Sequence, residues 1–523
     1  MTRAAAPSTE GFLRARRVMT LATGVEGDAI WWREGRIVAV GRAAEIARAV
    51  PAGVPRYEYP EALVTPGFVD GHTHFALWAL GRRRVQLAGA ATLAAAVARV
   101  AAARPVQGWV IGPGWDANGW SEAPDRAALD RVQPVPVYLD SLDVHAAWVN
   151  TAALTAAGIG RGTADPPGGR IARDAAGEPS GLLLERAVEL VARVLPTPPA
   201  DLLDAALLAA QAEAHRLGIT GIHDVEDAVA YEGLRRLEGR DRLRLRVLFH
   251  HPVASLSSLV RAGVRSGQGS AWLATGGVKL FLDGSLGSRT AWMLEPYEGS
   301  PSRGMPITDE AEARDAMRFA AGHGLAATVH AIGDAAVRRA LDLMTPLPPV
   351  AVPHRIEHFQ CVDTEDLHRA AEAGIVVSMQ PAHLLTDIPL VDRHWGARGR
   401  GAYAFGSLLR RGTRMVFGSD APVATLDPRA GVFAALERRM EGSAGAAWRP
   451  DETIGLEEAV HAYTAGAADA GGVPGRRGRL APGMDADLVV WSVAPEDRAG
   501  AGEAFRSGEA LLTVVGGEVV LRR

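Results

Sequence analysis

Two histidines, His72 and His74, are separated by a single residue and form the first candidate metal-binding pair along the chain. On an extended strand, residues i and i+2 lie on the same face, so the two imidazoles would point the same way. Such a pair can bind a divalent metal ion, and a purely structural pair of histidines is the alternative. Three further residues of ligand type each lie at the end of an apolar run: His330, His358 and Asp420.

Lys279 is the only lysine of the chain, and all the other basic residues counted among the 56 Lys and Arg are arginine. A guanidinium stays charged, whereas a buried lysine can become a neutral amine. A neutral amine can react with carbon dioxide to give a carbamate, whose oxygens can bridge two divalent ions. We therefore expect Lys279 to be a metal ligand in its carbamylated form, with an ordinary salt-bridged lysine as the alternative.

These residues lie in or directly after short apolar runs of the kind found in buried parallel strands. Segments with helical spacing follow several of them, which predicts an α/β fold with a TIM-like (β/α)8 barrel. The eight runs are residues 63–70, 218–224, 243–249, 276–283, 324–330, 354–360, 374–380 and 414–420. Because catalytic residues of such barrels lie at the carboxyl ends of the strands, the six candidate ligands should meet at one end of the barrel.

Two further parts surround the predicted barrel, which we place at residues 64–483. Residues 1–63 and 484–523 contain short β-like runs with turns at Glu34-Gly35 and Gly516-Gly517, so we expect one small β-sandwich domain from both ends of the chain. A long insertion after the first barrel strand, at about residues 80–217, would cover the mouth of the barrel and shape a substrate pocket.

Composition limits the class of protein. The 523 residues are 48% hydrophobic and 22% charged, with a net charge of −4, which is typical of a soluble protein without a nucleic-acid-binding surface. One cysteine, Cys361, excludes a site built from several cysteines, so metal ligands must be His, Asp, Glu or modified Lys. The chain has no secretory signal and no apolar run long enough to span a membrane, so we expect it to be cytoplasmic.

Several motifs together resemble the amidohydrolase superfamily, and within it the YtcJ-like branch that includes N-substituted formamide deformylases (amidohydrolase family 3). The motifs are TPGFVDGHTHF, GPGWDANGW, HAAWVN, GGVKLFLDGSLGSRTA, HAIGDAAV, RIEHFQ, MQPAH, GSDAPV and PGMDADLVVW. The resemblance implies a metal-dependent hydrolase in which all six ligand positions are kept. It also implies two divalent metal ions, with zinc as the first candidate.

The resemblance implies a role for each ligand position. His72, His74 and Asp420 would hold one ion, His330 and His358 the second, and carbamylated Lys279 would bridge them. A hydroxide bridging the ions would attack the substrate, and Asp420 would act as general base and then general acid. The candidate substrate-binding residues are Trp115, Asp116, His145, Asn150, His223, Asp283, Arg289 and His383. For Asn150, the cap of a helix at residues 151–158 is an equal alternative.

The expected reaction is hydrolysis of a non-peptide C–N bond in a small-molecule amide of the N-substituted formamide type. Two alternatives stay open: a deaminase or cyclic amide hydrolase of the same superfamily, and a metal-binding scaffold without activity. We expect no nucleic-acid or membrane partner, and a homodimer is one arrangement that the sequence allows.

Overall fold

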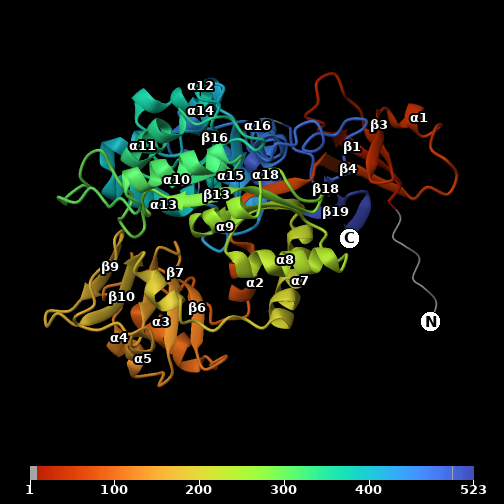
Figure 1. Ribbon diagram of the computed structural model, residues 1–523. Helices are drawn as coiled ribbons and strands as arrows, with labels where there is room; N and C mark the ends of the chain where they lie inside the picture. Colours follow the sequence, from red (N-terminus) through yellow and green to blue (C-terminus); the bar gives the residue numbers. More distant parts are fainter. Residues whose placement is uncertain (1–8, 444, 497–498) are drawn as a thin grey trace, which may run out of the picture.

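The computed structural model describes residues 9–443, 445–496 and 499–523. Within these residues the strands form three separate sheets, namely a barrel sheet, a sheet from the two ends of the chain and a sheet in the insertion. Figure 1 shows the insertion, drawn in orange and yellow, as a lobe beside the barrel, and the sheet from the chain ends on another side. No helix among the described residues has the length and apolar character that a membrane crossing requires.

The barrel sheet has eight parallel strands, one overlapping each predicted run, although residues 63–66 of the first run belong to the sheet from the chain ends. A parallel bridge between Thr73 and Ala421, with hydrogen bonds from Asp420 N to His72 O and from His74 N to Ala421 O, joins the last strand to the first at the carboxyl end. The strands are β5 (Phe68–Thr73), β11 (Ile219–Val225), β12 (Arg246–Pro252), β13 (Leu273–Phe281), β14 (Ala326–Ala331), β15 (Arg355–His358), β16 (Val376–Met379) and β17 (Met415–Phe417).

The helices around the barrel bury one apolar face each against the strands or against each other. For example, α7 packs against α2 and α8, while α10 and α11 pack on β14. These helices are α2 (Phe75–Gly81), α7 (Ala200–Arg216), α8 (Ala228–Gly239), α9 (Leu256–Arg261), α10 (Glu310–Gly322), α11 (Asp334–Met344), α12 (Arg369–Glu372), α13 (Pro381–His394), α14 (Phe405–Arg410), α15 (Pro428–Glu437), α16 (Leu456–Tyr463), α17 (Ala465–Ala470) and α18 (Ala501–Ser507).

The two ends of the chain pair in a single hydrogen-bonded sheet, in the order β20-β19-β18-β4-β1-β2-β3. Both predicted turns are present, and Glu34, Gly35, Gly516 and Gly517 all have positive φ, as tight hairpin turns require. The strands are β1 (Gly11–Val18), β2 (Ala29–Arg33), β3 (Arg36–Gly41), β4 (Arg56–Pro66), β18 (Leu488–Trp491), β19 (Ala510–Val515) and β20 (Glu518–Arg522), and the short helix α1 (Ala43–Ile46) covers one face of this sheet.

The insertion has its own mixed sheet, in the order β6-β7-β8-β10-β9. Its core contains Trp115 and Trp148 with the half-buried Trp120, whose rings lie 6.1–6.4 Å apart. The strands are β6 (Val110–Trp115), β7 (Val137–Ser141), β8 (Ala146–Val149), β9 (Gly169–Arg173) and β10 (Pro179–Glu185), with helices α3 (Leu93–Ala102), α4 (Arg126–Asp130), α5 (Thr151–Ala156) and α6 (Val188–Ala192).

Candidate metal centre and substrate cavity

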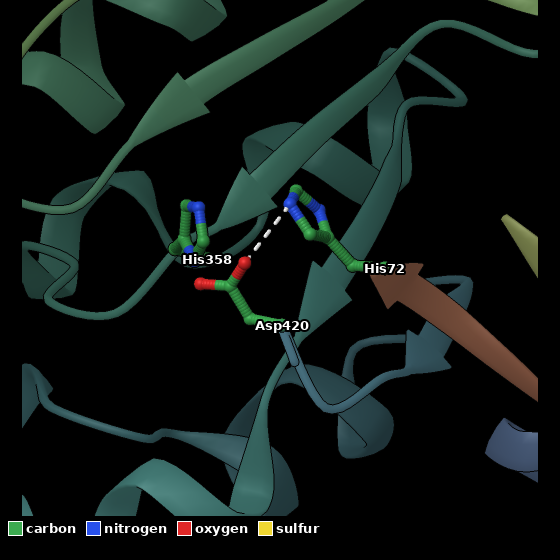
Figure 2. A group of neighbouring side chains, drawn as sticks. All are labelled: His72, His358 and Asp420. Atoms are coloured by element: carbon green, nitrogen blue, oxygen red, sulfur yellow. Dashed lines mark ion pairs between the residues drawn. The ribbon is translucent and has the colours of Figure 1, made fainter. Parts of the chain in front are cut away.

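The carboxyl ends of β5, β15 and β17 bring three of the candidate ligands together. One ligand atom each of His72, His358 and Asp420 lies within 4.8 Å of the others, and all three residues are buried. Figure 2 shows Asp420 between the two imidazoles, with its carboxylate turned toward His72. His358 and Asp420 have φ of 71° and 58°, in the left-handed region, and residues held in such strained conformations gather at functional sites.

This compact group differs from the division that the family resemblance implies. There, His358 belongs with His330 rather than with His72 and Asp420. The structure places all of them close together: the His358 ring lies 4.4 Å from that of His330 and 5.1 Å from that of His72. His74 joins through its Nε2, which lies 3.1 Å from Asp420 Oδ1. The five residues therefore surround one space at the end of the barrel.

Each histidine is fixed by a hydrogen bond through one ring nitrogen. The Nδ1 atom of His74 lies 2.6 Å from Val225 O, and that of His358 lies 2.8 Å from Gln380 Oε1. His330 uses the other nitrogen, since its Nε2 lies 3.1 Å from Gly284 O. A ligand imidazole needs one nitrogen held in this way so that the other keeps its lone pair for a metal ion.

Two buried atoms in this group test whether a cation fits. His72 Nε2 and Asp420 Oδ1 lie 3.4 Å apart, yet neither makes a hydrogen bond. A buried polar atom without a partner is costly, and an imidazole nitrogen beside a carboxylate oxygen is a donor set that suits a divalent cation. The residues present therefore fit a metal ion.

The charge states agree with this fit. Burial and then the positive charge of Lys279 lower the pKa of His72 to about 4, so its imidazole is neutral near pH 7. Burial also lowers the pKa values of His330 and His358 well below the usual range. Burial acts to raise the pKa of Asp420, but the neighbouring histidines, His72 first, hold it well below its ordinary value. Neutral imidazoles and an ionised carboxylate are the forms that bind metals.

Lys279 lies on β13 and is buried, with its Nζ 4.7 Å from the centre of the Phe281 ring. Burial lowers its pKa to about 8, because the charged form loses its hydration. Its positive charge acts to lower the pKa values of His72, His74, His330 and His358, so the amine lies close to these imidazoles. The neutral amine that carbamylation needs is accessible at this position.

A cavity of about 450 Å³ opens above this group, between the barrel and the insertion. His330, His358 and Asp420 form part of its floor, and the indoles of Trp115 and Trp120 form part of its insertion wall. This size and the mixture of apolar walls with a few polar groups are typical of a small-molecule site.

The loop between β7 and β8 connects the insertion to the barrel at this cavity. Asp143 accepts hydrogen bonds from the hydroxyls of Ser285 and Ser288, at 2.6 and 2.7 Å, and both serines follow β13 of the barrel. Nearby, His145 Nδ1 lies 2.7 Å from Glu185 Oε2. Burial alone would lower the pKa of His145, but the Glu185 carboxylate raises it to about 9.

Five of the predicted substrate-binding residues line the cavity: Trp115, Asp116, His145, Arg289 and His383. The other three do not. Asn150 caps α5 by accepting from Ala153 N, and its amide donates to the carbonyls of Gln133 and Val135, so the capping alternative is the one that the structure supports.

His223 and Asp283 are also absent from the cavity lining and serve the barrel itself. His223 Nδ1 accepts a hydrogen bond from Arg355 inside the barrel, at 2.8 Å. Asp283 accepts from the backbone N–H groups of Trp292, Ile332 and Gly333, and so fixes the loops around the site. Their contact with a substrate therefore stays a prediction that the lining of this cavity does not support.

The sequence reasoning did not identify Arg355 and Glu357, which contact the metal-site residue His72 from within the barrel. Glu357 is hydrogen-bonded to His72 Nδ1 and to the Arg355 guanidinium, and both are fully buried. The sequence Arg355-Ile356-Glu357 could have indicated this contact, since it places two charged residues on the same face of a run predicted to be a buried strand.

Comparisons with known proteins agree with this architecture. A model of the amidohydrolase family matches residues 61–521. An amidohydrolase named YtcJ from Bacillus subtilis (strain 168) is 35% identical over 83% of this chain and 84% of its own. The protein LONG AFTER FAR-RED 3 of Arabidopsis thaliana is 31% identical over 94% of this chain and 88% of its own.

A more distant relative is the N-substituted formamide deformylase of Arthrobacter pascens, 28% identical over 92% of this chain and 93% of its own. The solved structure of an uncharacterized metal-dependent hydrolase from Pyrococcus horikoshii OT3 is similar with a TM-score of 0.77 and 24% identity, covering 95% of this chain and 99% of that one, which shows a shared fold. Since the family model covers most of the sequence and its fold is present, this chain belongs to the amidohydrolase family and is a hydrolase of that family.

Proposed function

We propose that this protein hydrolyses the C–N bond of a non-peptide amide in a metal-dependent reaction, with N-substituted formamides as the first substrate class. The observation that carries the proposal is the group of His72, His358 and Asp420, of which His358 and Asp420 line a cavity of about 450 Å³. The name of the Arthrobacter pascens relative, an N-substituted formamide deformylase, supports the choice of substrate class.

The proposed metal site takes ligands from five barrel strands or their carboxyl ends: His72, His74, Lys279, His330, His358 and Asp420. We propose two divalent ions, with zinc as the first candidate, and carbamylated Lys279 as the bridging ligand. Such ions polarise a substrate carbonyl and lower the pKa of water, which is the chemistry that the protein side chains alone lack. The burial of Lys279 near all four histidines supports its place in this set.

Asp420 is the proposed catalytic acid and base. Its Oδ1 lies 3.1 Å from His74 Nε2, while its Oδ2 lies 4.0 Å from Nε2 of the cavity residue His383. A carboxylate in this position accepts the proton of the attacking water and then delivers it to the departing nitrogen. Residues of the insertion form part of the wall of the cavity above it.

The test is a product assay with protein purified in the presence of zinc and bicarbonate. An N-substituted formamide, a cyclic amide and an amino-substituted heterocycle are supplied separately, and formate, the ring-opened acid and ammonia are measured. Formate release should fall by a factor of about 10² to 10⁴ in Asp420→Asn. The matched control is Asp392→Asn, which changes an exposed aspartate that accepts a hydrogen bond from Trp448 Nε1 and should keep the activity.

The other outcomes decide between the alternatives. Ring opening or ammonia release without formate release would replace the formamide proposal by a cyclic amide hydrolase or a deaminase. Bound metal with no turnover of any of the three substrates would favour the scaffold.

A further inference from the structure

An arginine and a glutamate form a charged pair inside the barrel, directly behind the metal site. Arg355 and Glu357 lie two residues apart on β15, and neither is exposed to solvent. The guanidinium binds the carboxylate through both Nε and Nη2, in the two-bond geometry that holds the two groups in a fixed plane.

The guanidinium also reaches three other strands of the barrel. Its Nη2 donates to Gly71 O on β5 at 2.6 Å and to Ser378 Oγ on β16 at 2.8 Å, and its Nη1 donates to His223 Nδ1 on β11 at 2.8 Å. Arg355 is thereby anchored across the barrel interior, and it holds Glu357 in place.

Stability does not explain this pair. Removing two charges from water costs several kcal/mol per ion, so a buried ion pair is often no more stabilising than apolar residues of the same volume. Apart from the bonds that anchor Arg355 itself, the contact that an apolar pair could not supply is the hydrogen bond that Glu357 accepts from His72 Nδ1.

We propose that Glu357 is a positioning residue for His72, and that Arg355 positions Glu357. The carboxylate accepts a hydrogen bond from the N–H group at His72 Nδ1, which keeps the proton there and leaves the lone pair on Nε2, the nitrogen that lies 3.4 Å from Asp420 Oδ1. This inference rests on the metal site of the proposed function and is independent of its substrate.

Glu357→Gln tests the inference because it keeps the size of the side chain. Arg355 offers only N–H donors, so the glutamine oxygen must turn toward the guanidinium and its NH₂ group then faces His72 Nδ1. That nitrogen must become the acceptor, which moves the imidazole proton to Nε2 and blocks metal binding there. We therefore expect metal affinity to fall by about 10- to 100-fold.

Asp487→Asn is the matched control. Asp487 makes a comparable buried two-bond pair with Arg246, with both distances 3.1 Å, but Asp487 contacts none of the proposed ligands. Both variants remove a buried negative charge from an arginine, so a general loss of stability should affect them alike.

The experiment uses Co²⁺ and bicarbonate as the probe on the full chain. Affinity is measured by competition with a chelator, the visible absorption of bound Co²⁺ reports the ligand geometry, and circular dichroism of the metal-free proteins checks folding. Weaker binding and an altered spectrum in Glu357→Gln, with both unchanged in Asp487→Asn, are the expected results. Wild-type affinity and spectrum in Glu357→Gln, or equal changes in both variants, would overturn the inference.

A crystal structure of the wild-type protein with Co²⁺ decides the matter if Glu357→Gln does not fold. The inference requires Nε2 of His72 on the metal and Nδ1 on Glu357, and coordination through Nδ1 would contradict it. Wild-type protein that binds no Co²⁺ would instead reject the metal site of the proposed function, so the two failures are distinguishable.

Discussion

Replacing Asp143 by alanine should loosen the junction between the insertion and the barrel. The side chain accepts hydrogen bonds from Ser285 and Ser288, which belong to the segment after β13. Burial acts to raise the pKa of Asp143, but nearby His145 and the serine hydroxyls bring it below its usual value, so the group is ionised at neutral pH.

The magnitude follows from these two bonds. A hydrogen bond to a charged group contributes about 1.5–3 kcal/mol, and two would give about 3–6 kcal/mol. Asp143 is half-buried, so water can replace part of the lost hydrogen bonding when the side chain is removed. We therefore expect the free energy of local opening at the junction to fall by about 2–4 kcal/mol. That corresponds to a roughly thirty-fold to several-hundred-fold increase in local opening.

Hydrogen exchange measured by mass spectrometry can detect this opening. Peptides covering residues 141–146 and 285–291 should exchange faster in Asp143→Ala, although the bond from Thr290 to Glu185 across the same junction remains. Asp125→Ala is the control, because Asp125 caps α4 within the insertion and should change exchange only near that helix. Unchanged exchange of both junction peptides would refute the assigned role of Asp143.

Three further predictions concern the metal ligand Lys279, the insertion and the terminal sheet. Lys279→Arg should lose metal and activity, whereas Lys279→Ala should recover part of both when acetate is added with metal. The metal content of each variant is measured with and without acetate. Normal metal content in Lys279→Arg would reject the bridging role. Trp115→Phe should lower the free energy of unfolding by about 1–3 kcal/mol, because the buried carbonyl of Leu139 loses the indole donor. Its metal content should stay the same. A free energy of unfolding equal to that of wild type in a denaturant titration would contradict this prediction. Burial acts to raise the pKa of Asp487, but Arg246 lowers it overall, so the ion pair stabilises the protein above about pH 4, the unfolded value, and this stabilisation is lost as pH falls through the folded pKa. The difference in free energy of unfolding between wild type and Asp487→Asn should therefore become smaller in acid. A difference that does not change with pH would be evidence against the pair.

The barrel could be predicted from the sequence because each strand is buried on both faces and therefore reads as a continuous apolar run. The hairpin turns at Glu34-Gly35 and Gly516-Gly517 were predictable for a local reason, since few residues tolerate positive φ. The sheet of the insertion was not predicted. Its strands are short and pair in both directions, and Pro113 and Gly181 interrupt the apolar pattern of β6 and β10.

In the candidate site too, residues that follow a local sequence pattern could be predicted, and contacts between distant segments could not. His72 and His74 follow from the two-residue period of a strand, and the other ligands from the rule that barrel sites lie at carboxyl ends. The contacts of Arg355 with β5, β11 and β16, and of Asp143 with Ser285, depend on which distant segments meet in space. No local pattern encodes those distances, so they became visible only in the structure.

The number and position of bound metal ions decide whether the six ligand residues form a two-metal centre. Protein purified with excess zinc and bicarbonate should contain close to two equivalents per chain, and anomalous diffraction should place both ions among the six ligand residues. One firmly bound ion with full activity would reject the two-metal site. Zinc bound elsewhere, or none at all, would contradict the assignment of a metal centre to this end of the barrel.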